Sequence, residues 1–140
     1  MTPKAVVRAL LTKSHALVNE ANAHGKTPLH VACEHGSLSC ALLLVEAGAG
    51  LNAADVQGCT PLIRACLAGD DGAVQLLAEC RAALDATDGV GMSALFRASV
   101  QGHAGCVKSL LREGAALQPP VEGAKPIVLV VGRAEANGHA

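Results

Sequence analysis

Apolar side chains return every three or four residues in short runs along this chain, and glycines separate the runs. In residues 61–68 the run includes Leu62, Ala65 and Cys66, and a second run of the same kind follows Gly69. This spacing places the apolar side chains on one face of a helix. The pattern predicts helices at 5–13, 28–35, 38–47, 61–68, 71–80, 94–101, 104–113 and 126–136.

The pattern repeats every 33 residues: the stretches GKTPLHVACEHG, GCTPLIRACLAG and GMSALFRASVQG begin at residues 25, 58 and 91. A glycine at the start permits the positive φ of a turn, and the Thr or Ser two residues later can cap the N-terminus of a helix. Proline suits the first helical position, and a glycine at the end can adopt the left-handed conformation that stops the helix. Each unit is therefore a helix pair that needs its neighbours to bury both helices, which is typical of a solenoid.

These units resemble ankyrin repeats. The match rests on TPLHVAC followed by LLLVEAGA in the first unit, TPLIRAC followed by QLLAE in the second, and SALFRAS followed by KSLLREGA in the third. The resemblance implies an all-α fold, an ankyrin-repeat solenoid of stacked helix-turn-helix units joined by long, hairpin-like loops. It implies one domain over residues 1–140, made of a half repeat at 4–24, full repeats at 25–57, 58–90 and 91–122, and a partial repeat at 123–140.

The resemblance also implies roles for framework residues and reveals a departure from the family pattern. His30 is expected to form hydrogen bonds within the repeat framework, and Asp55 and Asp88 are expected to brace the turns. Arg81 stands where a glycine should end the second helix of its unit.

Composition limits the residue types that can form the core, and net charge limits the classes of partner that are expected. About half of the 140 residues are apolar, yet the chain has no Trp or Tyr and a single Phe, so its core must be built from Ala, Leu, Val and Cys. A formal net charge of −1 gives no attraction to nucleic acid or an anionic membrane. No run approaches the ~20 apolar residues of a membrane span, and the apolar start is too short for a secretory signal. We expect a soluble monomer in the cytoplasm, with the nucleus as an alternative.

No motif for a catalytic, cofactor or metal site is present in the sequence. Cys33 and Cys66 lie one period apart at positions that accept small residues, and there is no C-x-x-C pair. Buried, reduced thiols are therefore expected among the six cysteines rather than zinc ligands or disulfides. The neighbouring Asp70 and Asp71 are interpreted as helix-capping residues. We expect no enzyme activity and no cofactor.

The segment PIVLVVGRAEANGHA at 126–140 supports a second interpretation. Its β-branched run could form a strand that ends in glycine, as at the start of a nucleotide-binding fold. The spacing from Gly132 to Gly138 is wrong for a phosphate-binding loop, and the repeat register favours a helix. The alternative function is accordingly a fragment of a larger protein whose C-terminal tail belongs to a catalytic or small-ligand site.

The leading prediction is a non-catalytic protein–protein interaction module: an adaptor, a scaffold or a regulatory segment. The resemblance implies that a partner meets the loop tips and the outer face of the first helix of each unit. The positions that match are Lys26, Glu34, His35, Val56, Gln57, Cys59, Leu67, Val90, Met92, Val100 and Gln101. Five members of this set are expected to face solvent along one groove: Val56, Leu67, Val90, Met92 and Val100. Such a groove favours an aliphatic or helical peptide segment of another protein as the partner.

Overall fold

The computed structural model describes residues 15–116. A short 3-10 helix, η1 (His15–Asn19), precedes three helix pairs: α2 (Pro28–Glu34) with α3 (Leu38–Glu46), α4 (Pro61–Ala68) with α5 (Asp71–Glu79), and α6 (Ala94–Gln101) with α7 (Ala104–Arg112). The six helices predicted in this range are confirmed: each begins at the predicted residue and ends within one residue of the prediction. The helices predicted at 5–13 and 126–136 lie outside the described residues, and η1 was not predicted.

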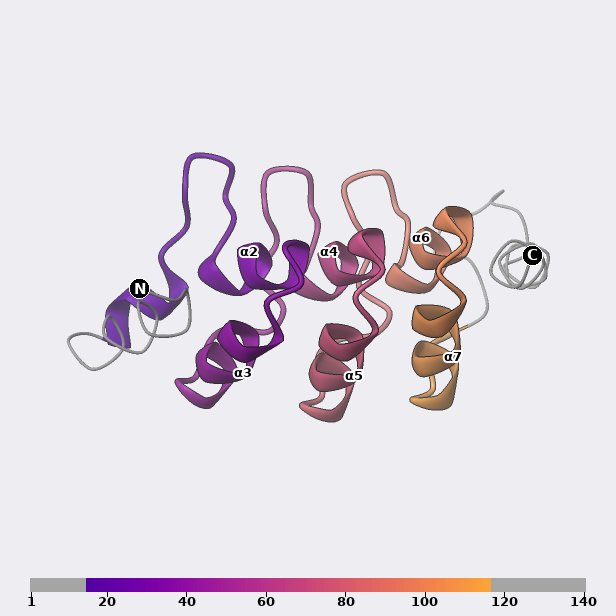
Figure 1. Cartoon of the computed structure of the whole chain (residues 1–140). Helices are drawn as coiled ribbons and strands as arrows, with labels where there is room; N and C mark the ends of the chain where they lie inside the picture. The colour runs from indigo at the N-terminus through magenta and orange to yellow at the C-terminus, as the bar shows by residue number, and fades with distance from the viewer. Residues whose placement is uncertain (1–14, 117–140) are drawn as a thin grey trace.

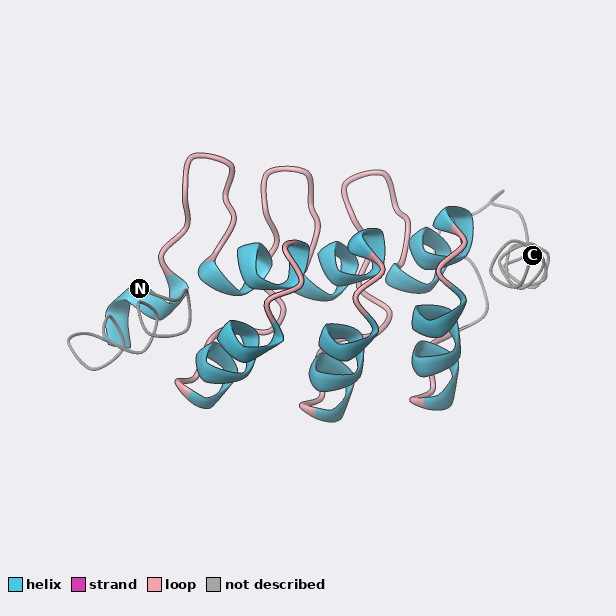
Figure 2. Cartoon of the chain, viewed as in Figure 1, coloured by secondary structure: helices cyan, strands magenta, loops and turns pink. Residues whose placement is uncertain are grey.

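The helix pairs stack side by side into a solenoid. In Figure 1 the first helices α2, α4 and α6 form one row, the second helices α3, α5 and α7 form another, and the long loops project on the same side. Within residues 15–116 the chain forms helices, turns and loops, with one isolated antiparallel bridge between Thr87 and Ser93 (Figure 2). The predicted all-α repeat solenoid is confirmed.

The first helix of each unit begins and ends as the sequence predicts. The hydroxyls of Thr27, Thr60 and Ser93 accept hydrogen bonds from backbone N–H groups three residues later, at 3.5, 3.3 and 3.2 Å. Gly69 and Gly102 end α4 and α6 in the left-handed conformation, with φ of 73° and 77°. Because these caps satisfy free backbone groups at the helix ends, they fix where each helix starts and stops.

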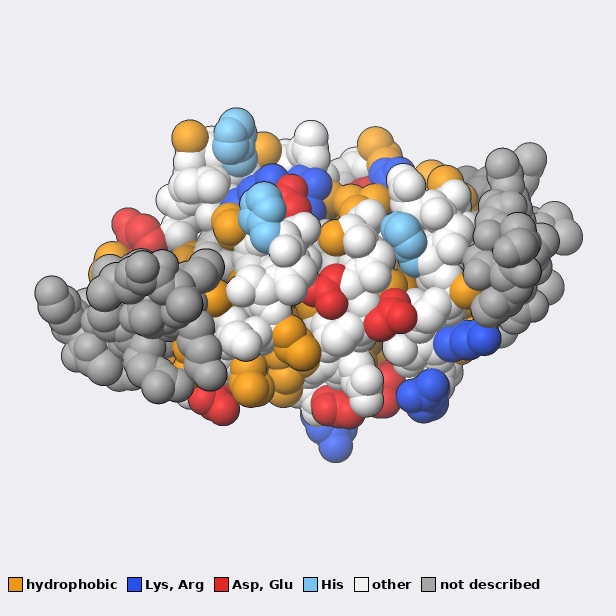
Figure 3. Space-filling view, in the orientation of Figure 1, with side chains coloured by type: hydrophobic (Ala, Val, Ile, Leu, Met, Phe, Trp, Pro, Cys, Tyr) orange, Lys and Arg blue, Asp and Glu red, His pale blue; other side chains and the backbone are white. Residues whose placement is uncertain are grey.

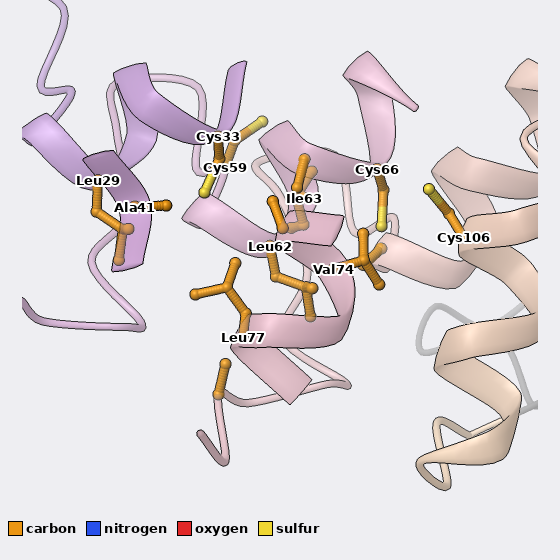
Figure 4. Packing of buried hydrophobic residues seen from close by; sticks show 14 of the residues in the cluster. Leu29, Cys33, Ala41, Cys59, Leu62, Ile63, Cys66, Val74, Leu77 and Cys106 are labelled. Atoms are coloured by element: carbon orange, nitrogen blue, oxygen red, sulfur yellow. The ribbon is translucent and has the colours of Figure 1, made fainter. Parts of the chain in front are cut away.

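Equivalent residues of successive units fill a continuous core of small side chains. Two sets of leucines are buried in every unit, and the members of each set are one period apart. They are Leu29, Leu62 and Leu95 in the first helices and Leu44, Leu77 and Leu110 in the second helices. Cys66 and Cys106 face each other from neighbouring units in Figure 4. This packing explains how the protein forms a core with so few aromatic residues.

The cysteines behave as buried thiols, as predicted. All six are free, and five of them are buried; Cys80 is the half-buried exception. Burial, with added repulsion from Asp70 and Cys66, raises the pKa of the Cys33 thiol to about 12. A hydrogen bond with Cys66, together with burial and the nearby Asp71, raises the pKa of the Cys106 thiol. Because the thiolate is the reactive form, these thiols are held in an unreactive state.

His30 joins the first unit to the second. Its Nδ1 lies 3.1 Å from the Thr27 backbone N–H, which donates to it, and its Nε2 lies 2.8 Å from the carbonyl oxygen of Cys59. A ring nitrogen that accepts at Nδ1 carries its proton at Nε2, so the ring donates to Cys59. The side chain is fully buried, and the framework role implied for it is confirmed.

Arg81 keeps the conformation of the glycine that it replaces. Its φ is 69°, and it is the sole non-glycine residue in the described part of the chain with a positive φ. The equivalent residues of the neighbouring units are Gly48 and Gly114, with φ of 89° and 97°. The fold therefore imposes the left-handed turn even where the side chain disfavours it.

Recurring hydrogen bonds join successive units along both edges of the solenoid. At the loop tips, the N–H of Val56 donates to the His24 carbonyl at 3.1 Å, and the N–H of Gly89 donates to the Gln57 carbonyl at 2.9 Å. At the opposite ends of the helices, side-chain oxygens accept from backbone N–H groups 31 residues later, each at 2.8 Å, in the pairs Asn19–Gly50, Asn52–Ala83 and Asp85–Ala116.

Candidate protein-binding grooves

A buried aspartate shapes the tip of each of the loops at 47–60 and 80–93. One carboxylate oxygen of Asp55 accepts from the backbone N–H groups of Gln57 and Cys59, at 2.9 and 3.0 Å. Asp88 repeats the arrangement with the N–H groups of Val90 and Met92, at 3.1 and 3.0 Å. The bracing role implied for both aspartates is therefore confirmed.

An arginine from the following helix completes each aspartate site. Arg64 Nε donates to the second oxygen of Asp55 at 2.9 Å, and Arg97 Nε donates to that of Asp88 at 2.8 Å. Burial opposes ionisation of Asp55, but the hydrogen bonds from Arg64 and the backbone outweigh it and lower the pKa. The pKa of Asp88 is lowered in the same way, against burial, by the Met92 N–H, Arg97 and the Val90 N–H. Both carboxylates are therefore held ionised within the tips.

A groove lies between the loop tips of the second and third repeats, and we refer to it as the second groove. It has a volume of about 770 Å³, and its walls include Val56 and Gln57 from one tip, Val90 from the next, and Leu67 and Arg97 from α4 and α6. Val56 and Val90 are 71% and 66% exposed. Two valines on loop tips that face solvent over a hollow are a candidate contact surface for a partner.

The equivalent place one repeat earlier, the first groove, is largely filled. It has a volume of about 170 Å³ and is lined by His24, Lys26, Val56, Gln57 and Arg64. Two polar contacts occupy it: Lys26 Nζ lies 2.8 Å from a Glu34 oxygen, and Arg64 Nη2 donates to Gln57 Oε1 at 2.7 Å. The hydrogen bond from Lys26 lowers the pKa of Glu34, which keeps this ion pair charged at neutral pH.

Side chains at equivalent positions explain the difference between the grooves. Lys26 and Glu34 correspond to Cys59 and Leu67 one period later, so the second groove has no such ion pair. Gln57 corresponds to Val90, so the described residues offer Arg97 no amide oxygen like the one that Arg64 contacts. In Figure 3 charged side chains gather above α2 and α4, with apolar atoms between them and α6.

The structure distributes the predicted contact residues over several places. Five of them line the second groove, namely Val56, Gln57, Cys59, Leu67 and Val90, although Cys59 exposes little surface there. Val100 and Gln101 are exposed on α6, and Met92 is half-buried, but these three are not part of the groove wall. Lys26 lines the first groove, Glu34 pairs with it, and His35 is exposed at the end of α2.

Cys59 corrects one expectation. It was predicted as a contact residue for a partner, but it is only 4% exposed. Its N–H donates to the Asp55 carboxylate, and its carbonyl oxygen accepts from the Asp55 N–H at 3.0 Å and from His30. These bonds fix the backbone, and the side chain is part of the hydrophobic core (Figure 4). The Cys59 thiol is therefore unavailable as a surface contact.

Arg64 and Arg97 were missing from the predicted contact set. The signal was present, since an arginine follows the capping Thr or Ser by four residues in both TPLIRAC and SALFRAS. Each arginine also follows an aspartate by nine residues, which is the separation of the ion pairs in the structure.

A further hollow of about 590 Å³ lies against α2 and α3, lined by apolar residues such as Val31 and Leu44 and by polar residues such as Glu20 and Lys26. The equivalent faces of α4 and α5 pack against the preceding unit. This hollow is therefore the stacking face of the first repeat, and the second groove is the better candidate for an external partner.

The described residues contain neither a cluster of metal-binding side chains nor a helix that could span a membrane. Between residues 15 and 116, no three His, Cys, Asp or Glu side chains gather in a way that could hold a metal ion. No described helix is long and apolar enough to cross a membrane. The segment 126–140, on which the catalytic or small-ligand alternative rests, lies outside the described residues.

Stacked helix pairs with projecting loops and a groove between their tips define a helical-repeat solenoid. Two family models match the chain, both described as ankyrin repeats: one, of many copies, over residues 10–65, and one, of three copies, over residues 51–121. The chain belongs to the ankyrin repeat family, whose repeats are generally protein–protein interaction modules. None of the curated proteins compared with the chain matches it.

Proposed function

We propose that this protein is a non-catalytic binding module, acting as an adaptor or regulatory segment, and that it holds a peptide segment of another protein in the second groove. The observation that carries the proposal is the exposure of Val56 and Val90 on either side of a groove of about 770 Å³. Removal of apolar surface from water contributes about 25 cal/mol per Å², so a few aliphatic contacts can anchor a peptide.

Rigidity of the groove supports the same proposal. Its two tips are joined by the hydrogen bond from Gly89 to Gln57, and each tip is braced by a buried aspartate. A site whose backbone is already fixed loses little conformational entropy when a partner binds, which favours affinity. The aliphatic valines favour aliphatic side chains on the partner segment.

Selection from a random peptide library displayed on phage tests the proposal. The library is selected on the parent protein, and the dissociation constant of the strongest synthetic peptide is measured. In the Val56→Ser, Val90→Ser double variant we expect binding to weaken by about tenfold, because two buried apolar contacts are lost. The thermal midpoint should change little, since both side chains are exposed.

Leu42→Ser is the matched control, because Leu42 is an apolar residue of α3 that is 44% exposed and lies outside the groove wall. It should leave binding of the peptide unchanged. Selection that yields no binding peptide, or peptides that bind the double variant as well as the parent, would rule out the second groove as the binding site.

A further inference from the structure

The second groove contains an arginine whose hydrogen-bonding capacity is only partly used. Arg97 contacts the same oxygen of Asp88 through Nε at 2.8 Å and through Nη2 at 2.7 Å. Among the described residues, no other side chain accepts from it. Because a guanidinium carries five N–H donors, several are not used by these contacts, and Arg97 lines the groove.

The equivalent arginine of the preceding unit shows how such donors are satisfied. Arg64 makes the same contacts to Asp55, at 2.9 and 2.8 Å, and in addition donates through Nη2 to Gln57 Oε1 at 2.7 Å. Its side chain is 13% exposed, whereas that of Arg97 is 31% exposed. The acceptor is missing at Arg97 because Val90 occupies the position equivalent to Gln57.

Asp88 does not compete for a ligand at this place. Its first oxygen accepts from two backbone N–H groups, its second accepts from Arg97, and its side chain is 4% exposed. Asp55, which also lines the groove, has a fully buried side chain, so among the described lining residues Arg97 offers the exposed charge beside the apolar wall formed by Val56, Leu67 and Val90.

We propose that Arg97 binds a side-chain carboxylate of the partner, at the position that an amide oxygen occupies beside Arg64. This inference rests on the proposed function and specifies its partner as a segment with an Asp or Glu next to an aliphatic residue. The aliphatic side chain packs against Val56, Leu67 and Val90 while the carboxylate accepts from Arg97 Nη2. A charged acceptor is preferred to an amide because hydrogen bonds between two ionised groups are stronger than those with a neutral partner.

Two variants at one position separate the arginine contact from the apolar contact. Val90→Gln restores the Gln57–Arg64 arrangement at Arg97 and occupies its donors, whereas Val90→Met adds a side chain of similar length that is a poor acceptor. The probe is the strongest acidic peptide from the phage selection, paired with the same peptide carrying the amide in place of the carboxylate.

For the parent protein and for Val90→Met, we expect the acidic peptide to bind about three- to tenfold more tightly than its amide counterpart, as for a partly exposed charged hydrogen bond. For Val90→Gln the two peptides should bind equally. The preference of the parent should also shrink as salt is added, because the contact is partly exposed to solvent.

Failure of this inference is distinguishable from failure of the proposed function. Selected peptides without an Asp or Glu, equal binding of the acid and the amide to the parent, or an acid preference that persists in Val90→Gln would each overturn the carboxylate contact. All three outcomes leave the Val56→Ser, Val90→Ser result intact. Loss of the acid preference in Val90→Met would equally overturn it, because the arginine donors stay open in that variant.

Discussion

The first and second grooves occupy the same place in successive repeats, yet their volumes are about 170 and about 770 Å³. The backbone around them is nearly the same: both have an aspartate-braced tip, an arginine four residues after a capping hydroxyl, and a hydrogen bond between neighbouring tips. The side chains that line the two grooves differ. In the first groove the protein's own Lys26–Glu34 and Arg64–Gln57 contacts occupy the space, and in the second groove the equivalent residues leave it open.

This comparison separates two kinds of residue in a repeat. Glycines, aspartates and capping hydroxyls set the frame, and they recur at a spacing of 33 residues. Residues such as Gln57 and Val90 leave the frame unchanged but decide whether a groove is filled or available to a partner. The tests with the largest expected effects change residues of the frame. Those with smaller effects change the contacts or the conformation of such residues.

The largest effect is expected where the two tips approach most closely. A Cβ added at Gly58 would lie 2.4 Å from the Gly89 nitrogen, and one added at Gly25 would lie 3.0 Å from the Val56 nitrogen. Both glycines also have a positive φ, of 79° and 72°. Gly58→Ala should cost about 2 kcal/mol or more of unfolding free energy, measured by urea denaturation, and more than Gly25→Ala. Equal costs would show that the backbone frames of the two grooves do not differ in tightness.

The arginines should differ in their contribution to stability. Arg64→Ala leaves the fully buried Asp55 carboxylate without its cation, and it also removes the contact with Gln57. We expect a loss of about 2–3 kcal/mol, against about 1 kcal/mol for the more exposed Arg97→Ala. Urea denaturation of both variants measures the difference. A larger loss for Arg97→Ala would contradict the idea that Arg97 is kept partly free for a partner.

Acid should weaken both tips together. The folded-state pKa of Asp55 and of Asp88 is lowered below the ordinary value of 3.8, so their stabilisation is present above that value and is lost as the pH falls through the lowered folded-state pKa. The effect should be smaller than that of Arg64→Ala, because a protonated carboxyl keeps part of its hydrogen bonding. Unfolding free energies measured at about pH 6 and about pH 3 should fall less in the Asp55→Asn, Asp88→Asn variant than in the parent. Parallel pH profiles would assign the acid sensitivity to other groups.

The smallest effect is expected at Arg81, which keeps a positive φ although its side chain disfavours that conformation. Arg81→Gly should stabilise the protein by about 0.5–1 kcal/mol, because glycine adopts a positive φ without steric cost. Gly48→Ala, at an equivalent turn, should have the opposite effect; a Cβ there meets no atom within 4 Å, so the change reports conformation alone. Thermal melting of both variants provides the measurement. If Arg81→Gly is destabilising, then a contact of the arginine outweighs its backbone strain.

The sequence predicts the frame well because each frame residue acts locally. A glycine, a capping hydroxyl and a proline at fixed spacing determine where a helix begins, and the capping hydroxyl does so in all three units. The side chain of Cys59 was misplaced because its direction depends on hydrogen bonds to Asp55 and to His30 of the preceding unit. The sequence predicted a groove with apolar residues, but it did not reveal the unused donors of Arg97, because these result from the absence of a pair such as Gln57–Arg64. A pattern of apolar and polar positions does not encode such pairs, whereas a comparison of equivalent positions reveals them.

The hydrogen bonds along the loop-tip edge of the solenoid have a consequence for how the sequence can change over evolutionary time. The bonds from Val56 to His24 and from Gly89 to Gln57 at the tips use backbone atoms only, so they do not depend on the side chains of Val56 and Gln57. Substitution of a valine or a glutamine at a tip therefore leaves the spacing of the repeats unchanged. Recognition can drift from one ligand to another by single replacements, while the architecture that presents the groove is inherited intact.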